Sequence, residues 1–174
     1  MKLAIMRHGP AEDGSPLVHD VDRPLTPEGR VRVRVAAAQL AAEAEGPLTI
    51  VSSPLVRALQ TAEIVAARCE VESHGGLVLV KRGMSPGANL IDVLTELRAE
   101  RRKRVLLVGH EPSVGALVSE LLGRFLPRGF SKAMVVGLSI GDEALPGDAW
   151  SAKFRYLVDP KTQRFEREPE RVFA

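Results

Sequence analysis

The sequence predicts an α/β fold in which a mainly parallel sheet is covered by helices on both faces. Short apolar segments typical of buried strands alternate with longer helical segments along most of the chain. The chain has 174 residues, of which 45% are hydrophobic and 26% are charged, so it is long enough to bury a substantial core. We expect one domain spanning residues 1–174, with six strands at residues 2–8, 49–52, 77–81, 104–109, 133–140 and 152–157.

The first two helices are expected after the first and second strands. In LTPEGRVRVRVAAAQLAAEA, Thr26 is placed to cap a helix and Pro27 stands at its first position. The alternation RVRVRV is typical of a strand, but the alanines favour a helix and the apolar residues share one helical face. In SSPLVRALQTAEIVAA, we expect Ser53 to cap the second helix and Pro54 to follow it.

The remaining segments complete the predicted sheet and its cover. A third helix is expected at about residues 88–102, and a fourth follows VGHEP with Pro112 at its start. Only GDEALPGDAW separates the last two predicted strands, so we expect an antiparallel hairpin at one edge of the sheet. From Asp159 the tail is polar and contains proline, which predicts a surface strap without chemistry.

Composition and charge argue against several classes of protein. The net charge is only +2, and the densest basic run, RRKR at 101–104, ends a predicted helix without interleaved aromatic residues, so we expect no nucleic-acid binding. No apolar run approaches the ~20 residues that span a membrane, and the stretch before Arg7 is too short for a signal peptide. The single cysteine, Cys69, allows no intrachain disulfide. We expect a cytoplasmic protein without membrane association.

Basic side chains stand where three of the predicted strands end. The first strand ends in Arg7 and His8, Arg57 follows the second strand in the first turn of a helix, and His110 follows the fourth. Ligands bind outside the carboxyl ends of parallel strands, so these side chains and two helix N-termini should meet there. Guanidinium groups and helix N-termini bind phosphate, and an imidazole can attack phosphorus. The sequence therefore predicts a phosphoryl site in which Arg7 binds the group and His8 attacks it.

A metal site is the first alternative, because VHDVD places His19, Asp20 and Asp22 close together. However, no HExxH, HxH or cysteine pair accompanies them. We therefore expect no metal, and an acidic loop in which Asp22 orients Arg23. Any one of the four site residues taken alone has an ordinary structural explanation, and it is their shared position at strand ends that favours a functional site.

Several motifs resemble known proteins. Three motifs resemble the histidine phosphatase superfamily: MRHG in the first strand, SSPLVRALQTAEI at the second strand–helix junction and VGHEP after the fourth strand. The segment DRPLTPEG resembles the loop and helix start found in the short branch of that superfamily. MSPGAN, GFSKAMVVGLSI and the closing W…FRYLVDP are similar to SixA-like phosphohistidine phosphatases. The resemblance implies a three-layer α/β/α sandwich of the phosphoglycerate mutase-like type. It also implies His8 as nucleophile, Arg7, Arg57 and His110 as the phosphate pocket, and no metal or cofactor.

The mechanism that follows is a double displacement. Neutral His8 attacks phosphorus in line and becomes phosphohistidine, and water then displaces the phosphate. Arg7, Arg57 and a protonated His110 would hold the equatorial oxygens. The two histidines share a reference pKa near ~6.5, so they must take opposite charge states at neutral pH. We expect the arginines to keep His8 uncharged and the bound phosphoryl group to favour the cation on His110. The other ring N–H of His8 needs an acceptor, for which a local backbone carbonyl is suited.

Two features of the sequence favour phosphohistidine as the substrate. Phosphomonoesterases and mutases of this superfamily usually carry a carboxylic acid after the third strand to protonate the leaving alkoxide. Here that region reads KRGMSPGANLIDV, and its nearest acid, Asp92, falls inside a predicted helix. Imidazole, with a pKa near ~6.5, leaves far more easily than an alkoxide without such help. The short connection also leaves no room for a helical lid, which suits a phosphate carried on a protein, such as a histidine phosphotransfer domain.

Two other functions stay open on the sequence alone. A small-molecule phosphomonoesterase of the same superfamily would need a proton donor, for which Glu12, Asp13, Asp20, Asp22 and Glu111 are candidates. A non-catalytic phosphate-binding module would use the same scaffold, but such modules usually lose the nucleophile or an arginine. All four of those positions are present in this chain.

Overall fold

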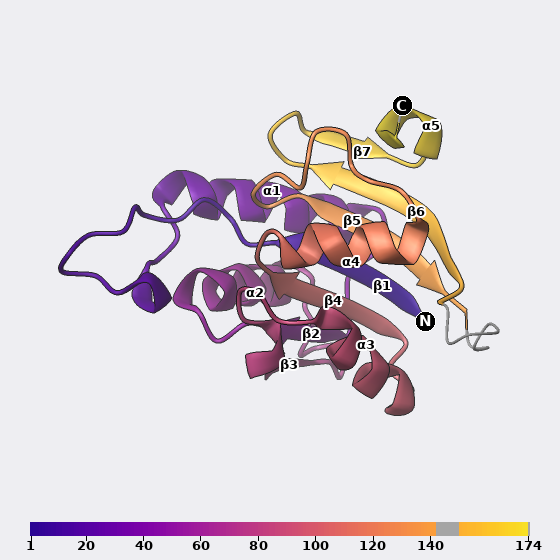
Figure 1. Ribbon diagram of the computed structural model, residues 1–174, viewed down its shortest axis with the longest axis horizontal. Helices are drawn as coiled ribbons and strands as arrows, with labels where there is room; N and C mark the ends of the chain where they lie inside the picture. Colours follow the sequence, from indigo (N-terminus) through magenta and orange to yellow (C-terminus); the bar gives the residue numbers. More distant parts are fainter. Residues whose placement is uncertain (142–149, 174) are drawn as a thin grey trace.

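The centre of the molecule is a seven-stranded sheet with the order β3-β2-β4-β1-β5-β6-β7 (Figure 1). The computed structural model describes residues 1–141 and 150–173. Strands β1 to β4 pair in parallel, whereas β5, β6 and β7 join the sheet through antiparallel pairs. The strands are β1 Lys2–Arg7, β2 Thr49–Ser52, β3 Leu77–Val80, β4 Arg104–Gly109, β5 Val135–Ile140, β6 Ala152–Asp159 and β7 Arg164–Glu166.

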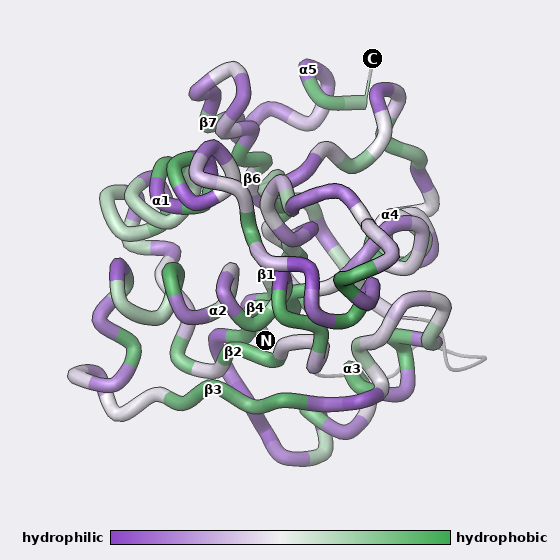
Figure 2. Tube along the Cα trace, turned by 90° about the vertical axis from the view of Figure 1, so that its left-hand side faces the viewer, coloured by the Kyte–Doolittle hydropathy of each residue, from purple (hydrophilic) through white to green (hydrophobic). Residues whose placement is uncertain are grey.

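Helices cover both faces of the sheet, which confirms the predicted α/β sandwich. Apolar side chains of α1 and α2 pack on one face of the strands, and those of α3 and α4 pack on the other. Figure 2 shows the apolar central strands between these helices. The helices are α1 Pro27–Ala42, α2 Val56–Arg68, α3 Leu90–Ala99, α4 Ser113–Leu122 and α5 Pro169–Phe173, with 3-10 turns η1 Asp20–Asp22 and η2 Arg82–Met84. Among the described residues, no helix is long and apolar enough to cross a membrane.

The continuous apolar runs of the central strands supply both faces of the core. In β1, Leu3 and Ile5 belong to the core beneath α3 and α4, whereas Ala4 and Met6 belong to the core beneath α1 and α2. Successive side chains of a strand point to opposite faces, so a strand covered on both sides must be apolar throughout.

The start of α1 confirms the predicted cap. The Thr26 hydroxyl accepts a hydrogen bond from the Gly29 amide at 2.9 Å, and Pro27 occupies the first helical position. The RVRVRV segment is helical, as the alanines predicted, and Val33 within it is fully buried.

Two predicted helix boundaries are wrong. Helix α2 begins at Val56 with Leu55 as its N-cap, and Ser53 does not cap it. The Ser53 hydroxyl accepts from the Leu55 amide at 3.3 Å and lies 2.9 Å from a ring nitrogen of His110, so a tertiary contact takes its place. Helix α3 is also shorter than expected and ends at Ala99.

The tail, which the sequence predicts to be a surface strap without chemistry, has regular secondary structure. It adds β7 to the edge of the sheet beside β6 and then forms α5. Phe165 stacks on Tyr156 with ring centroids 5.1 Å apart, and this contact holds a largely polar strand in place. Strands β5 and β6 do pair antiparallel as predicted, but β7 rather than this pair forms the edge. Most of the segment that connects them, 142–149, lies outside the described residues.

The register of the sheet brings the three predicted strand ends together. Arg7 of β1 lies opposite Gly109 of β4, and Ser52 of β2 lies opposite Val108. The amide of His8 also donates to the carbonyl of Gly109 at 3.0 Å. Residues that follow β1, β2 and β4 therefore emerge at one edge of the sheet, as expected for parallel strands.

Candidate active site

His8 follows β1 directly and is held by its own backbone. Its Nδ1 lies 2.7 Å from the carbonyl oxygen of Gly9. Because a carbonyl oxygen only accepts, Nδ1 carries the ring proton and Nε2 keeps the lone pair. This confirms the expectation that a local backbone carbonyl fixes the ring.

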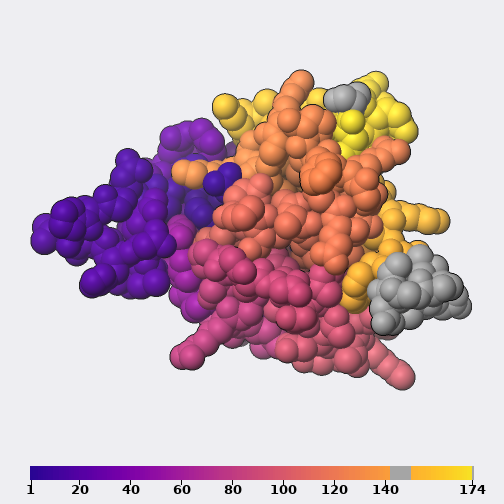
Figure 3. Space-filling view, in the orientation of Figure 1, coloured from indigo at the N-terminus to yellow at the C-terminus, as the bar shows by residue number. Residues whose placement is uncertain are grey.

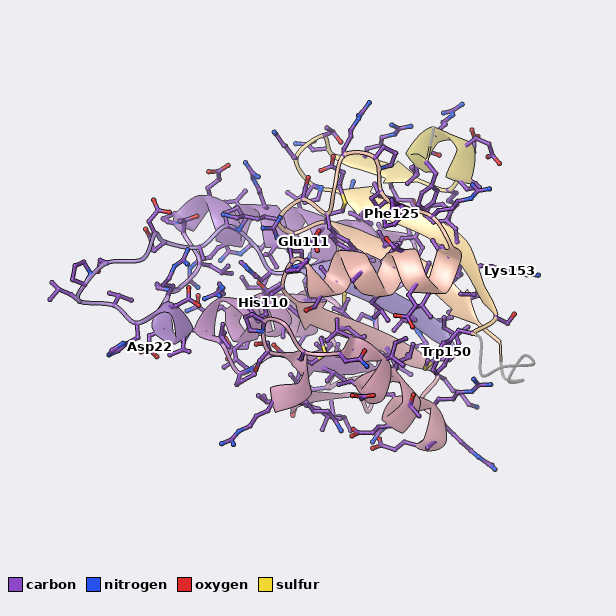
Figure 4. The ribbon with its side chains drawn as sticks, in the orientation of Figure 1. Asp22, His110, Glu111, Phe125, Trp150 and Lys153 are labelled. Atoms are coloured by element: carbon purple, nitrogen blue, oxygen red, sulfur yellow. The ribbon has the colours of Figure 1, made fainter. Side chains whose placement is uncertain are left out.

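His110 faces His8 across the same site. The two ring centroids are 5.0 Å apart and the ring planes are inclined by 55°. The Nε2 atom of His110 lies 2.9 Å from the Ser53 hydroxyl, which fixes the second ring from the end of β2. Figure 4 labels His110 and Glu111 at the beginning of α4. The sheet therefore brings together two imidazoles from strands that are far apart in sequence.

Arg57 reaches the site from the first turn of α2, and its side chain is almost fully buried. Its Nη1 donates to the backbone carbonyl of Asp20 at 2.5 Å, and its Nη2 donates to the Asp20 carboxylate at 3.0 Å. Thr61, one turn further along α2, donates to the Arg57 carbonyl at 2.7 Å and accepts from the Gly9 amide at 3.1 Å. The hydroxyl of Thr61 thus ties α2 to the chain beside His8.

Arg7 completes the set of four predicted residues. Its Nη1 donates to the carbonyl of Phe130 at 2.8 Å, so the loop before β5 holds one side of the guanidinium. Its charge, like that of Arg57, lowers the pKa of both His8 and His110, as expected for a cation close to both rings. The structure therefore groups Arg7, His8, Arg57 and His110 as the sequence predicted.

Two buried nitrogen atoms of this group lack a protein partner. In the part of the chain that the structure describes, the buried side-chain polar atoms without a hydrogen bond are Arg7 Nε, His110 Nδ1 and Gln39 Oε1. A buried polar group without a partner is costly and uncommon in folded proteins. Two of the three atoms belong to the four-residue site, and both are suited to bind an oxyanion. Arg7 Nε is a hydrogen-bond donor, and Nδ1 of His110 becomes a donor when it carries a proton.

Burial keeps both rings neutral in the ligand-free site. It is the largest influence on His8, whose pKa falls to about 3, with His110, Arg57 and Arg7 adding smaller effects in the same direction. The pKa of His110 falls to about 4, again chiefly through burial, while the Asp20 carboxylate opposes this fall. The arginines were expected to keep His8 uncharged, but burial contributes more than they do. A cation on His110 therefore requires an anion in the pocket.

The buried neutral His8 should make the protein sensitive to acid. A histidine in the unfolded chain has a pKa near ~6.5. Below that pH the unfolded chain therefore binds a proton at His8, whereas the buried ring in the folded protein stays neutral. The contribution of His8 to stability is therefore fully present above about pH 6.5 and is lost as the pH drops, by roughly 2 kcal/mol at about pH 5. Buried His110, whose pKa falls to about 4, adds a further loss that the wild type and a His8 variant share. Urea unfolding of the wild type and of His8→Gln at both ends of this pH range measures the difference. An equal loss of unfolding free energy in the two proteins would contradict a buried neutral His8.

The acidic residues near the site are engaged elsewhere or lie in solvent. Asp20 is held between Arg57 and Arg23, and hydrogen bonds from both guanidiniums lower its pKa. The Glu111 carboxylate accepts from the Gly115 amide at 2.9 Å, at the start of α4. Glu12, Asp13 and Asp22 are exposed. The Glu111 charge opposes the fall in the pKa of Arg7 that burial causes, so Glu111 lies near the site, but its carboxylate, like that of Asp20, already accepts a hydrogen bond.

The loop between β1 and α1 corrects one further expectation. Arg23 is oriented by Asp20, through a 2.8 Å bond, and not by Asp22. Among the described residues, no group of three or more His, Cys, Asp or Glu side chains is arranged to hold a metal ion. The Asp20–Arg57 contact joins residues 37 positions apart, so sequence spacing gave no sign of it; only the three-residue spacing of Asp20 and Arg23 was visible.

The chain is similar to known proteins over most of its length. A family model described as histidine phosphatase superfamily (branch 1) matches residues 3–78. A protein of a Picosynechococcus species is 38% identical over 171 residues, covering 92% of this chain and 98% of the relative. A phosphohistidine phosphatase SixA homolog of Haemophilus influenzae is 32% identical over 146 residues, covering 79% of this chain and 87% of that protein.

A solved structure gives the same result for the fold. The structure of the protein histidine phosphatase SixA complexed with tungstate matches with a TM-score of 0.79 and 28% identity, covering 94% of this chain and all of that chain. The chain belongs to the histidine phosphatase superfamily and is a phosphatase.

Proposed function

We propose that this phosphatase removes the phosphoryl group from phosphohistidine on a partner protein. In this proposal, His8 of the enzyme holds the phosphoryl group as a covalent intermediate before water releases it as phosphate. The proposal depends on the hydrogen bonds and ion pairs already made by the carboxylates near the site. Asp20 is an ion-paired carboxylate and Glu111 is bonded to a helix N-terminus. An alkoxide leaving group needs a proton donor in the site, whereas a phosphohistidine ring that is protonated on its other nitrogen leaves as neutral imidazole without one. A phosphorus–nitrogen bond therefore suits this site better than a phosphate ester.

In the first step the His8 Nε2 lone pair attacks phosphorus in line. The new bond joins Nε2 to phosphorus and the substrate P–N bond breaks. Its electron pair stays on the departing imidazole, which leaves neutral because the substrate ring carries a proton on its other nitrogen. The Nδ1–H···O=C bond to Gly9 fixes the tautomer and stabilises the positive charge that develops on the ring. In the second step water attacks phosphorus, the Nε2–P bond breaks, and inorganic phosphate leaves with His8 neutral again.

We assign the other three residues to binding the negatively charged oxygens of the phosphoryl group. That charge is spread over the equatorial oxygens in the transition state, so fixed cations around them stabilise it. Arg7 contributes Nε, which has no protein partner, and Arg57 contributes the N–H groups not used by Asp20. His110 contributes Nδ1, and a proton taken up there with the dianion makes it a donor.

Two features of the surface support a protein as the carrier of the phosphoryl group. The connection between β3 and α3 is the short segment 81–89, so no helical lid separates the pocket from a large substrate. The loop 11–25 projects from the molecule next to this site (indigo in Figure 3) and carries Leu17, whose side chain is 93% exposed. The relatives named above as phosphohistidine phosphatases point in the same direction.

One pair of assays tests the proposed substrate. Release of phosphate from a phosphorylated histidine phosphotransfer domain is compared with release from p-nitrophenyl phosphate and from sugar phosphates, with His8→Ala as control. We expect kcat/KM to be at least about a hundredfold higher for the phosphoprotein than for the sugar phosphates, because the alkoxide leaving group of a sugar phosphate needs an acid. p-Nitrophenolate leaves without one, so p-nitrophenyl phosphate reports whether the site transfers a phosphoryl group at all. Faster turnover of an alkyl phosphate would identify a phosphomonoesterase instead. Failure to turn over any of these substrates would favour a phosphate-binding module.

A further inference from the structure

A carboxylate outside the four-residue site is bonded to two arginines at its margin. Asp20 lies in η1, on the loop between β1 and α1. It receives hydrogen bonds from both terminal nitrogens of Arg57, one at its backbone carbonyl and one at its carboxylate. Its second carboxylate oxygen accepts from Arg23 at 2.8 Å, and Arg23 in turn donates to the Glu12 carbonyl at 2.6 Å. Arg57 is therefore held by one residue that is itself anchored.

We infer that Asp20 is a positioning residue, which fixes the plane of the Arg57 guanidinium so that its remaining N–H groups face the phosphoryl oxygens. An arginine side chain has many rotamers, and a planar guanidinium recognises an oxyanion only in a narrow range of orientations. Two bonds from a single partner define that plane before the substrate arrives, which reduces the ordering needed on binding. This inference rests on the proposed role of the pocket as a phosphoryl site.

The charge of Asp20 supports the same role. The ring of His8 lies beside that of His110, and burial, followed by the charges of Arg57 and Arg7, lowers the pKa of His110. Asp20 is the anion that acts against them and raises this pKa. Protonation of His110 when a phosphate dianion binds is thus easier with Asp20 in place. Loss of this charge should be visible in the pH dependence of phosphate binding, which a purely structural contact would not change.

The opposite role makes the opposite prediction. If Asp20 merely occupied Arg57 until a phosphoryl group displaced it, its removal would free the guanidinium and strengthen binding. The geometry favours positioning, because Asp20 engages Arg57 with its backbone as well as its side chain, and Arg23 holds the same carboxylate. Displacing Asp20 would break all of these bonds at once.

The experiment uses Asp20→Ala and Asp20→Asn, with Asp20→Glu as the conservative variant and Asp22→Asn as matched control. Asp22 lies in the same turn and is exposed, and its carboxylate has no hydrogen-bond or ion-pair partner among the residues that the structure describes. For each protein we would measure kcat and KM on the phosphohistidine protein, the affinity for inorganic phosphate by calorimetry across pH, and the melting temperature.

We expect Asp20→Ala to weaken inorganic phosphate binding and to lower kcat/KM by about tenfold to a hundredfold, the range typical of hydrogen bonds to charged groups. Asp20→Asn should fall between Asp20→Ala and the wild type, and Asp20→Glu should recover part of the loss. The pH range in which phosphate binds should shift downward in Asp20→Asn, because His110 loses the nearby anion. The control Asp22→Asn should behave as the wild type, and all variants should melt within a few degrees of it.

Stronger phosphate binding or a higher kcat/KM in Asp20→Ala would overturn the inference and show a displaceable blocking group. Unchanged phosphate affinity with an unchanged pH profile would overturn it as well, as would a wild type that binds no phosphate. The calorimetric arm does not depend on the substrate. A wild type that binds phosphate but does not hydrolyse phosphohistidine would therefore refute the proposed function alone.

Discussion

Replacing His8 with alanine is expected to reduce turnover of the phosphohistidine protein by roughly 10⁴-fold or more, as removal of a nucleophile does in other covalent mechanisms. The reason is positional: Nε2 is the ring nitrogen left with a lone pair, and the Gly9 carbonyl holds the other. The 5.0 Å separation of the ring centroids places His110 close by, but His110 is held through its own Nε2 by Ser53. It should therefore not replace His8 as nucleophile.

A stopped or radiolabelled phosphate-release assay measures this loss, and His74→Ala is the matched control. His74 is an exposed histidine whose Nδ1 also lies within hydrogen-bond distance of a backbone carbonyl, that of Glu70, on the turn after α2. The control should retain wild-type activity. Turnover by His8→Ala within about tenfold of the wild type would show that another group attacks phosphorus.

Replacing Gly29 with alanine is expected to produce the largest loss of stability among single substitutions near the site. A Cβ atom at this position would lie 2.0 Å from the carbonyl oxygen of Pro10 and 2.9 Å from its carbonyl carbon. Both are backbone atoms, so no side-chain rotation can relieve the clash and α1 must move. The same carbonyl accepts from the Thr26 amide at 3.1 Å, and this contact joins the start of α1 to the chain just beyond His8.

We expect Gly29→Ala to lower the free energy of unfolding by about 3 kcal/mol or more, because overpacking against backbone relaxes poorly. For a chain of this size that corresponds to a fall in melting temperature of roughly 6–12 °C. Activity should fall as well, since the displaced segment adjoins Gly9 and His8. Gly14→Ala is the control, because its nearest neighbour would be an arginine side chain at 4.0 Å. A Gly29→Ala protein that melts with the wild type would refute the close approach of α1.

The strands and α1 were predictable because local and tertiary preferences agree there. Residues 49–52 and 104–109 form strands with the predicted boundaries, since each is an apolar or β-branched run buried on both faces. The Thr26-Pro27 pair fixed the start of α1 although the following alternation indicated a strand. The grouping of Arg7, His8, Arg57 and His110 was predictable for a related reason: parallel strands bring their carboxyl ends, and the helices that follow them, to one edge of the sheet. The roles of these four residues stay a prediction.

The wrong predictions share a cause, which is contact between distant parts of the chain. Ser53 has the character of a helix cap, but His110 lies against its hydroxyl and α2 starts later. The polar tail has a weak strand pattern, yet it forms the edge strand β7, in which Phe165 stacks on Tyr156 of β6. The sequence around Asp20 suggests a metal ligand or a proton donor, because no neighbouring residue indicates its contact with Arg57. Contacts of this kind join residues that are distant in sequence, so they can be identified only once the fold is known.

The central claim is that His8 carries the phosphoryl group on Nε2 during turnover. The most direct measurement mixes the wild-type enzyme with a phosphorylated histidine protein, stops the reaction in alkali, where phosphohistidine survives, and maps the phosphate by mass spectrometry and ³¹P NMR. We predict one labile phosphate, on the peptide that contains His8, as the Nε2 isomer that the Gly9 contact dictates. Phosphate on His110, on a carboxylate or on Nδ1 of His8 would contradict the account.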